Sequence, residues 1–141
     1  MPRLSDNTLF QRAVVLAIQD RNALADAYPK GSPHGLEARE EARRIQALKG
    51  KHIDALTDAD QPDAFAAFVN AELWVSGLIG TNQGKAVEDD SRRQLRLFRE
   101  VRLRRWGKTQ LEVMMETARS VDVRTLAEKG ASAPSARKDE G

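Results

Sequence analysis

The sequence predicts an all-α fold, a compact bundle of four or five helices with a disordered C-terminal tail. Hydrophobic residues recur at helical spacing across residues 5–121, and capping residues stand at the expected helix starts Asp60 and Thr109. The chain of 141 residues is long enough to bury one core. We therefore expect a single domain at residues 1–128 and, because residues 129–141 are small and polar, a flexible tail.

The first helix is expected to run from Ser5 or Asp6 to about Tyr28. Ser and Asp are good N-caps, and the sequence PKGSP after Tyr28 contains residues that end helices. The apolar residues form two stripes, which predicts contacts on two sides. Arg21 falls within one stripe, so we expect its guanidinium group to be partly buried and either paired with an acid or held at an interface.

A second helix is expected over about Leu36–Leu56. His52 lies on its apolar stripe, which predicts a core or boundary position for the imidazole. The opposite face carries the sequence EAREEARR at residues 37–44, where acids accompany the arginines. The charges of this face should therefore neutralise one another.

The third expected helix begins after Asp60, a good N-cap that is followed by Pro62 in the first turn. Its sequence AFAAFVNAELWVSGLIG is apolar on nearly every side. A helix of this kind belongs in the centre of a bundle, or in a bundle and a subunit interface together. We therefore expect self-association or binding of another subunit through residues 65–79.

The fourth expected element begins near Glu88 and includes the arginine-rich run at residues 91–108, SRRQLRLFREVRLRRWGK. A strand is the alternative, because leucine and valine partly alternate with arginine. We favour a helix, since Arg, Leu, Gln and Glu are good helix formers and β-branched residues are almost absent there. Arg102 and Arg105 lie on the apolar side of this helix, so their side chains should be partly buried and their charges paired.

A fifth helix is expected after Gly107, where Thr109 and Glu112 fit a capping box. It could follow the fourth helix directly or continue it with a kink. Met114 and Met115 occupy apolar positions of this helix, which predicts that they contribute to the core.

The sequence carries no recognisable catalytic or metal-binding motif. It has no cysteine, which excludes thiolate catalysis, disulfides and Cys-ligated zinc. His34 and His52 have no second histidine or carboxylate at metal-binding spacing, and residues 80–85, GTNQGK, lack the spacing of a P-loop. We expect neither an enzyme nor a bound cofactor or metal. No apolar run approaches the ~20 residues of a membrane span, so we expect a cytoplasmic protein without membrane contact.

The clearest functional feature is the charge of residues 91–108. This run holds seven arginines and one lysine against the single acid Glu100, whereas the whole chain has a net charge of +2. Arginine is suited to bidentate binding of phosphate groups. The local excess of positive charge favours a polyanionic partner, and we predict contacts with the phosphates of RNA or single-stranded DNA. The predicted nucleic-acid-binding residues are Arg92, Arg93, Arg96, Arg99, Arg102, Arg104, Arg105 and Lys108.

Two alternatives remain open for this run. Its arginines could form a solvated helix face and pair with acids from neighbouring helices, as charge runs commonly do. The protein could also be a helical adaptor or scaffold whose arginine-rich face binds an acidic protein partner. In the nucleic-acid interpretation, Arg92, Arg96 and Arg99 share the outward face and should act together.

An arginine-rich helix, SRRQLRLFREVRLRRW, combined with a bundle around AFAAFVNAELWVSGLIG, resembles the small helical subunits of CRISPR–Cas effector complexes. The resemblance covers residues 5–128 in pattern only. It implies a non-catalytic ribonucleoprotein subunit in antiviral defence, which stacks with copies of itself and guides RNA or a displaced DNA strand. No individual residue role is transferred, because that family has no sequence motif to align.

Overall fold

The computed structural model describes residues 4–81, 83–109 and 112–115. In these residues the chain forms four α-helices and two short 3₁₀-helices, and no strand. The predicted all-α bundle is therefore confirmed. Two compact units, Met1–Gly107 and Lys108–Gly141, make up the chain. The predicted domain boundary and tail lie outside the described residues.

Helix α1, Asp6–Ala27, starts and ends as predicted. Ser5 is its N-cap, and the Ser5 Oγ accepts a hydrogen bond from the backbone N–H of Thr8 at 3.1 Å. Its apolar stripes face two neighbours, because α1 packs against both α2 (Pro33–Gln46) and α3 (Gln61–Leu78). The buried residues of α1 are Leu9, Phe10, Ala13, Val14, Ala17 and Ala25.

Helix α2 is shorter than the sequence predicted, because it ends at Gln46 and not near Leu56. Gly50 has a φ of 86°, a left-handed conformation that glycine adopts without steric cost and that interrupts a helix. The backbone groups at this turn bind the side chain of Gln11 on α1, which accepts from the Gly50 N–H at 3.0 Å and donates to the Lys51 carbonyl at 2.6 Å. These bonds replace the helical hydrogen bonds of the predicted continuation.

The position of His52 differs from the prediction for the same reason. His52 precedes the 3₁₀-helix η1, Ile53–Ala55, and its Nδ1 accepts from the Asp54 N–H at 3.1 Å. The imidazole is exposed. The predicted core or boundary position is therefore wrong, because the chain is no longer helical at this residue and the apolar stripe does not continue.

A second 3₁₀-helix, η2 (Asp58–Asp60), leads into α3. Asp60 occupies the N-cap position of α3, as predicted, but makes no side-chain capping bond to that helix. Its carboxylate instead accepts from the Thr57 N–H at 3.1 Å and completes a capping box of η2.

Helix α3 is the central helix of the first unit, in agreement with its apolar sequence, and it packs against α1, α2 and α4 (Lys85–Trp106). Phe68 is fully buried. Its ring centroid lies 6.1 Å from that of Phe10 on α1 and 6.2 Å from that of Phe98 on α4. Three helices thus share one aromatic core.

Helix α4 confirms the helical interpretation of the arginine-rich run. It begins at Lys85, slightly before the predicted start at Glu88. Its C-cap is Gly107, whose φ of 69° is the left-handed conformation that commonly ends helices. Phe98 and Val101 are buried on the face that packs against α3, which leaves the opposite face of α4 to solvent.

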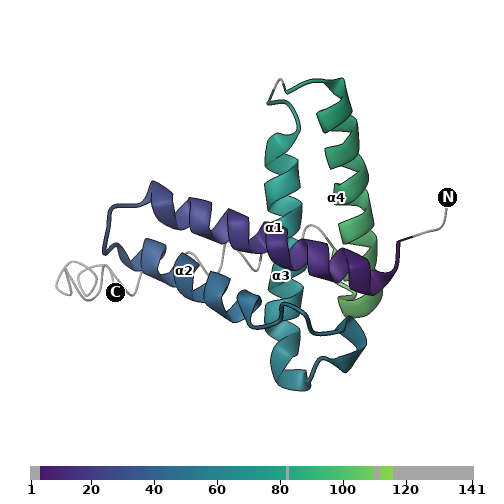
Figure 1. The fold of residues 1–141 in the computed structure, drawn as a ribbon, viewed down its shortest axis with the longest axis horizontal. Coiled ribbons are helices and arrows are strands. Elements are labelled where there is room, and N and C mark those ends of the chain that lie inside the picture. Colours follow the sequence, from purple (N-terminus) through teal and green to yellow (C-terminus); the bar gives the residue numbers. More distant parts are fainter. Residues whose placement is uncertain (1–3, 82, 110–111, 116–141) are drawn as a thin grey trace, which may run out of the picture. The chain divides into compact units, whose positions relative to one another are not determined.

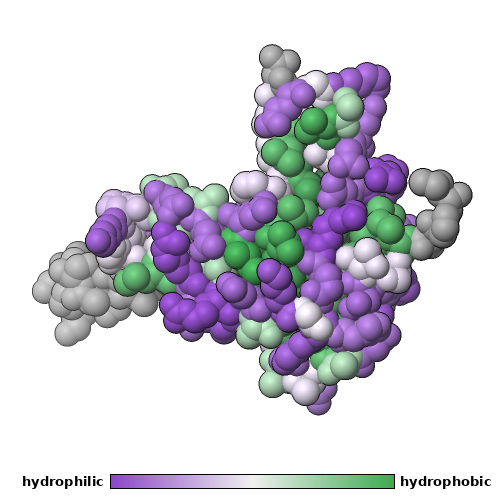
Figure 2. All heavy atoms as spheres, viewed as in Figure 1, coloured by the Kyte–Doolittle hydropathy of each residue, from purple (hydrophilic) through white to green (hydrophobic). Residues whose placement is uncertain are grey.

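Within the first unit, the helices form two antiparallel pairs (Figure 1). Helices α1 and α2 make one pair, α3 and α4 make the other, and α1 crosses α3 at the point of their contact. Figure 2 shows hydrophobic residues along the C-terminal half of α3, beside a mainly hydrophilic α4 surface. No helix in the described part of the chain is long and apolar enough to cross a membrane.

In the second unit, residues 112–115 are helical. The Thr109 Oγ1 accepts from the Glu112 N–H at 3.2 Å, which is one half of the predicted capping box. Met114 and Met115 are 58% and 54% exposed, so the predicted core position is wrong for both; Val113 takes the buried position of this turn. The rest of the predicted fifth helix lies outside the described residues.

Candidate nucleic-acid interface

Seven of the eight predicted nucleic-acid-binding residues lie on α4, and Lys108 follows this helix. The structure divides the seven arginines into two groups. Over residues 92–99 of α4, four arginines are at least partly exposed, and we call them the surface group. Over residues 102–105, three arginines bind acids of other elements, and we call them the anchoring group. The surface group is Arg92, Arg93, Arg96 and Arg99, and the anchoring group is Arg102, Arg104 and Arg105.

Arg102 is almost completely buried, with 1% of its side chain exposed. Its guanidinium group binds the carboxylate of Glu72 on α3 in a bidentate arrangement, with Nε 2.6 Å from Oε2 and Nη2 3.0 Å from Oε1. Each buried charge is thereby compensated. The predicted burial and pairing of Arg102 are confirmed. Its guanidinium group does not reach the surface, so Arg102 is left out of the contact surface proposed below.

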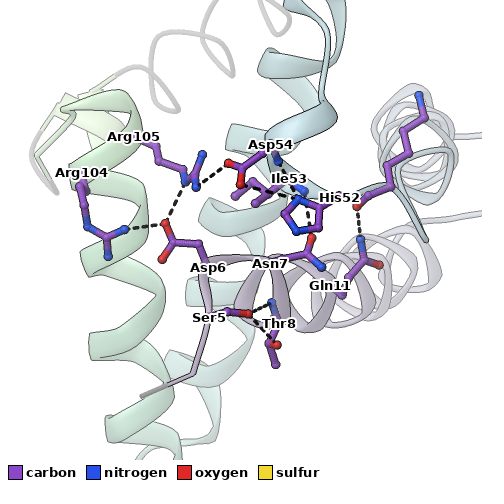
Figure 3. A network of polar contacts seen from close by, with 11 residues as sticks. Ser5, Asp6, Asn7, Thr8, Gln11, His52, Ile53, Asp54, Arg104 and Arg105 are labelled. Carbon is purple, nitrogen blue, oxygen red and sulfur yellow. Dashed lines mark hydrogen bonds and ion pairs between the residues drawn. The ribbon is translucent and has the colours of Figure 1, made fainter. Parts of the chain in front are cut away.

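Arg104 and Arg105 bind the start of α1 (Figure 3). The Asp6 Oδ2 lies 2.5 Å from the Arg104 Nη1 and 3.0 Å from the Arg105 Nε. The Arg105 Nη2 lies 3.0 Å from the Asp54 Oδ1 of η1. This network joins α1, η1 and α4, and it confirms the partial burial and pairing predicted for Arg105, whose side chain is 30% exposed.

Asp6 shows the electrostatic effect of these arginines. Burial by itself raises the pKa of the Asp6 carboxyl group, but the hydrogen bonds and charges of Arg105 and Arg104 outweigh it, and the pKa lies below the ordinary value of 3.8. Asp6 also stands in the first turn of α1, where a negative charge is favourable. Its carboxylate is therefore ionised at neutral pH and connects the N-terminus of α1 with the C-terminus of α4.

Arg21 on α1 also has a structural use. Its Nη2 lies 2.6 Å from the Asp20 Oδ2, and its Nη1 lies 3.3 Å from the Glu41 Oε1 on α2. Asn70 of α3 donates to the same Glu41 oxygen at 3.4 Å. The side chain of Arg21 is 18% exposed, so the predicted burial and pairing are confirmed.

The surface group is accessible and only partly neutralised. Arg92 and Arg93 each have 57% of the side chain exposed, and they bind Glu88 at 2.9 Å and Asp90 at 3.2 Å on the preceding turn. Arg96 is exposed, and no ion pair forms at its guanidinium group among the described residues. The positive charge of this turn is therefore available to an external anion.

Arg99 lies between the two groups. Its nearest acid is Glu72, whose Oε1 is 3.9 Å from the Arg99 Nε and already accepts from Arg102. The Arg99 Nε is buried without a hydrogen-bond partner, although 43% of the side chain is exposed. Together with Arg92 and Arg96, Arg99 follows a spacing of four and then three residues. These three side chains form one row of about 10 Å along the helix axis.

The described residues contain no group of three His, Cys, Asp or Glu side chains that could hold a metal ion. A hollow of about 440 Å³ between the end of α1 and the start of α2 includes one carboxylate, Asp26, which is bound to Arg39. A hollow of about 210 Å³ is lined by Asp20 and by Leu73, Trp74, Gly77 and Leu78 of α3. Neither hollow brings a histidine and a carboxylate together.

Sequence reasoning missed the acids that hold the anchoring group: Glu72, Asp6 and Asp54. For Glu72 a signal was present, because it is the one charged residue in the apolar sequence AFAAFVNAELWVSGLIG. A charge on the buried side of a helix needs a partner, and the apolar-side Arg102 is of opposite sign. For Asp6 and Asp54 no such signal exists, since both are ordinary residues at helix starts.

Comparison with known proteins found no match: no family model, no curated protein and no solved structure is significantly similar to this chain.

Proposed function

We propose that the protein is a non-catalytic nucleic-acid-binding accessory subunit of a cytoplasmic ribonucleoprotein complex, and that the surface group of α4 contacts phosphates of RNA or single-stranded DNA. The main support is Arg96, which is exposed and forms no ion pair within the described residues. It is flanked at helical spacing by Arg92 and Arg99, which are also partly exposed. A row of arginines on one helix face matches a repeating phosphate backbone better than it matches a single small anion.

The ion pairs within the surface group do not prevent such binding. Exposed pairs three or four residues apart on a helix contribute only about 0.3–0.5 kcal/mol each. The pair of Arg92 with Glu88 and that of Arg93 with Asp90 are of this type. A nucleic-acid strand whose phosphates meet several arginines at once therefore displaces these carboxylates at small cost in free energy. The bond between Arg102 and Glu72 is different, because it is buried.

The proposal is tested by the salt dependence of binding to a labelled single-stranded oligonucleotide. Each phosphate contact on a single strand contributes about −0.7 to the log–log slope, so four arginines predict a slope of about −3. The variant Arg92→Ala/Arg96→Ala/Arg99→Ala should lower affinity for every sequence alike and bring the slope to about −1.

A matched control removes three arginines from α2. Arg39, Arg43 and Arg44 are also exposed, and each is paired with an acid. The variant Arg39→Ala/Arg43→Ala/Arg44→Ala changes the net charge equally and should leave the slope unchanged. Equal loss of binding in both variants would show that only net charge matters and would contradict a site on α4.

The adaptor function is the second candidate, because this chain already uses carboxylates as arginine ligands. In that case an acidic protein would bind the surface group. Pull-down from the host with the wild type and with the Arg92→Ala/Arg96→Ala/Arg99→Ala variant distinguishes the two. Loss of bound RNA or DNA in the variant supports the nucleic-acid function, whereas loss of a nuclease-resistant protein partner supports the adaptor.

Self-association through α3 is part of the proposed assembly. Most apolar residues of this helix are enclosed, but Leu73 is 48% exposed and borders the hollow at Trp74 and Gly77. Sedimentation equilibrium should show concentration-dependent association that Leu73→Glu abolishes. The control is Val87→Glu on α4, another exposed apolar residue. A monomer at all concentrations would contradict this part of the proposal.

A further inference from the structure

The acids at the start of α4 are arranged to compete with any ligand of the surface group. Glu88 and Asp90 precede Arg92 and Arg93 by four and three residues, and their carboxylates lie 2.9 and 3.2 Å from the guanidinium groups. All four side chains are between 42% and 57% exposed, so these pairs lie at the surface where an external phosphate would bind. Asp89, between the two acids, binds Lys85 and not an arginine of the surface group.

We infer that Glu88 and Asp90 act as internal competitors for nucleic-acid phosphate and thereby weaken and shape its binding, an inference that rests on the proposed function. A carboxylate attached to the same helix is always present beside its arginine, so an external anion must displace it. A single carboxylate or phosphate gains little from this exchange. A nucleic-acid strand presents several phosphates and meets Arg96 and Arg99 at the same time, which offsets the displacement.

Glu88 and Asp90 thus favour a strand with several phosphates over isolated anions. They also keep the affinity for that strand low enough for the strand to dissociate. They act in the same way against a carboxylate ligand, so any anionic partner must make several contacts at once to displace them. On the proposed function, that partner is a phosphodiester chain.

The test is a double-mutant cycle between these acids and their arginines. Affinity is measured at about 20–200 mM salt with fluorescein-labelled oligouridylate and oligodeoxythymidylate of about 15 nucleotides. The variants are Glu88→Gln/Asp90→Asn, Arg92→Ala/Arg93→Ala and the combination of all four changes. Glu88→Gln/Asp90→Asn should raise the affinity for the oligonucleotide in the wild-type background and raise it less when Arg92 and Arg93 are absent. The gain in the first background should exceed the gain in the second by about three- to fivefold, as expected for the release of two ion pairs on one helix.

The control is Asp89→Asn, which removes the same charge on the same turn but frees only Lys85. The single variant Glu88→Gln is measured beside it, and Asp89→Asn should raise the affinity for the oligonucleotide less than Glu88→Gln does. Circular dichroism melting shows whether the variants keep α4, since an acid near a helix N-terminus also stabilises the helix.

The outcomes separate this inference from the proposed function. If the wild type binds and Glu88→Gln/Asp90→Asn raises affinity equally in both backgrounds, the acids act only through net charge and the inference is wrong while the proposed function stands. If neither the wild type nor Glu88→Gln/Asp90→Asn binds either oligonucleotide at about 20 mM salt, the proposed function itself fails.

Discussion

The two halves of α4 carry the same residue type and use it differently. In the second half, Arg102 binds an acid 30 residues away in the sequence, and Arg104 and Arg105 bind acids up to 99 residues away. In the first half, Arg92 and Arg93 bind acids four and three residues away on the same helix. A distant acid fixes one element against another, whereas a local acid neutralises one turn. The location of the acid, and not the number of arginines, therefore distinguishes a structural arginine from an available one.

The largest expected effect tests the buried member of the anchoring group. Arg102→Ala leaves the Glu72 carboxylate buried without its bidentate partner and should lower the free energy of unfolding by about 3–5 kcal/mol in urea titrations. Arg99→Ala, on the exposed side of the same carboxylate, should cost less than about 1 kcal/mol. Equal costs for the two variants would contradict the division of α4.

If Arg102→Ala does not fold, a paired replacement keeps this test decisive. Glu72→Leu/Arg102→Met removes both charges and retains similar side-chain volume, so it should fold and recover most of the lost stability. Failure of the paired variant to fold would contradict the explanation that Arg102 stabilises the protein by compensating the buried charge of Glu72.

The second prediction concerns Asp6, which binds two arginines from α4. Asp6→Ala removes both contacts and a favourable charge at the start of α1, and it should lower the free energy of unfolding by about 1–2 kcal/mol. Asp89→Ala removes one exposed pair on a single turn and should cost about 0.5 kcal/mol or less. Chemical denaturation of both variants measures the difference, and an equal cost would count against the network in Figure 3.

The third prediction is the pH dependence that follows from the lowered pKa of Asp6. A carboxyl group with a lower pKa in the folded state than in the unfolded state stabilises the fold above pH 3.8, and this contribution is lost as the pH falls through the folded-state pKa. The free energy of unfolding should therefore decrease as the pH is lowered from about 5 to below 3.8, and it should decrease less in Asp6→Asn. Parallel pH curves for the two proteins would contradict the assignment.

The smallest expected effect on stability comes from the surface group. Arg92→Ala/Arg96→Ala removes one local pair and one arginine that forms no ion pair within the described residues, so the free energy of unfolding should change by less than about 0.5 kcal/mol. Thermal and urea unfolding curves that superimpose on those of the wild type would confirm it. A loss comparable to that of Asp6→Ala would mean that the surface group is also structural.

Much of the fold could be predicted from local chemistry. The start of α1 follows from the capping chemistry of Ser5, and the central position of α3 follows from its apolar sequence. The end of α2 was predicted too late: Gly50 is a local signal for a helix end, but the bonds from the side chain of Gln11, about forty residues earlier, to the backbone at Gly50 and Lys51 have no local signal. A contact between distant residues leaves no periodic signal in the sequence.

The same limit applies to the arginine-rich run. Its hydrophobic periodicity correctly placed Arg102 and Arg105 toward the protein, because the apolar side of a helix is the side that is buried. Arg104 was not among the arginines expected to be buried or paired, and yet it binds Asp6. Only the three-dimensional approach of the α1 N-terminus to the end of α4 brings this acid within reach, so charge counting overestimated the available positive charge.

One measurement tests the division of α4 most directly: the arginine Nε–H signals of the protein followed by NMR during titration with a single-stranded oligonucleotide. The account predicts that the signals of Arg92, Arg93 and Arg96 shift, with a weaker change at Arg99. The signals of the anchoring group, Arg102, Arg104 and Arg105, should stay in place. Shifts in the anchoring group, or no shift in any arginine of α4 when binding is otherwise detected, would contradict the account.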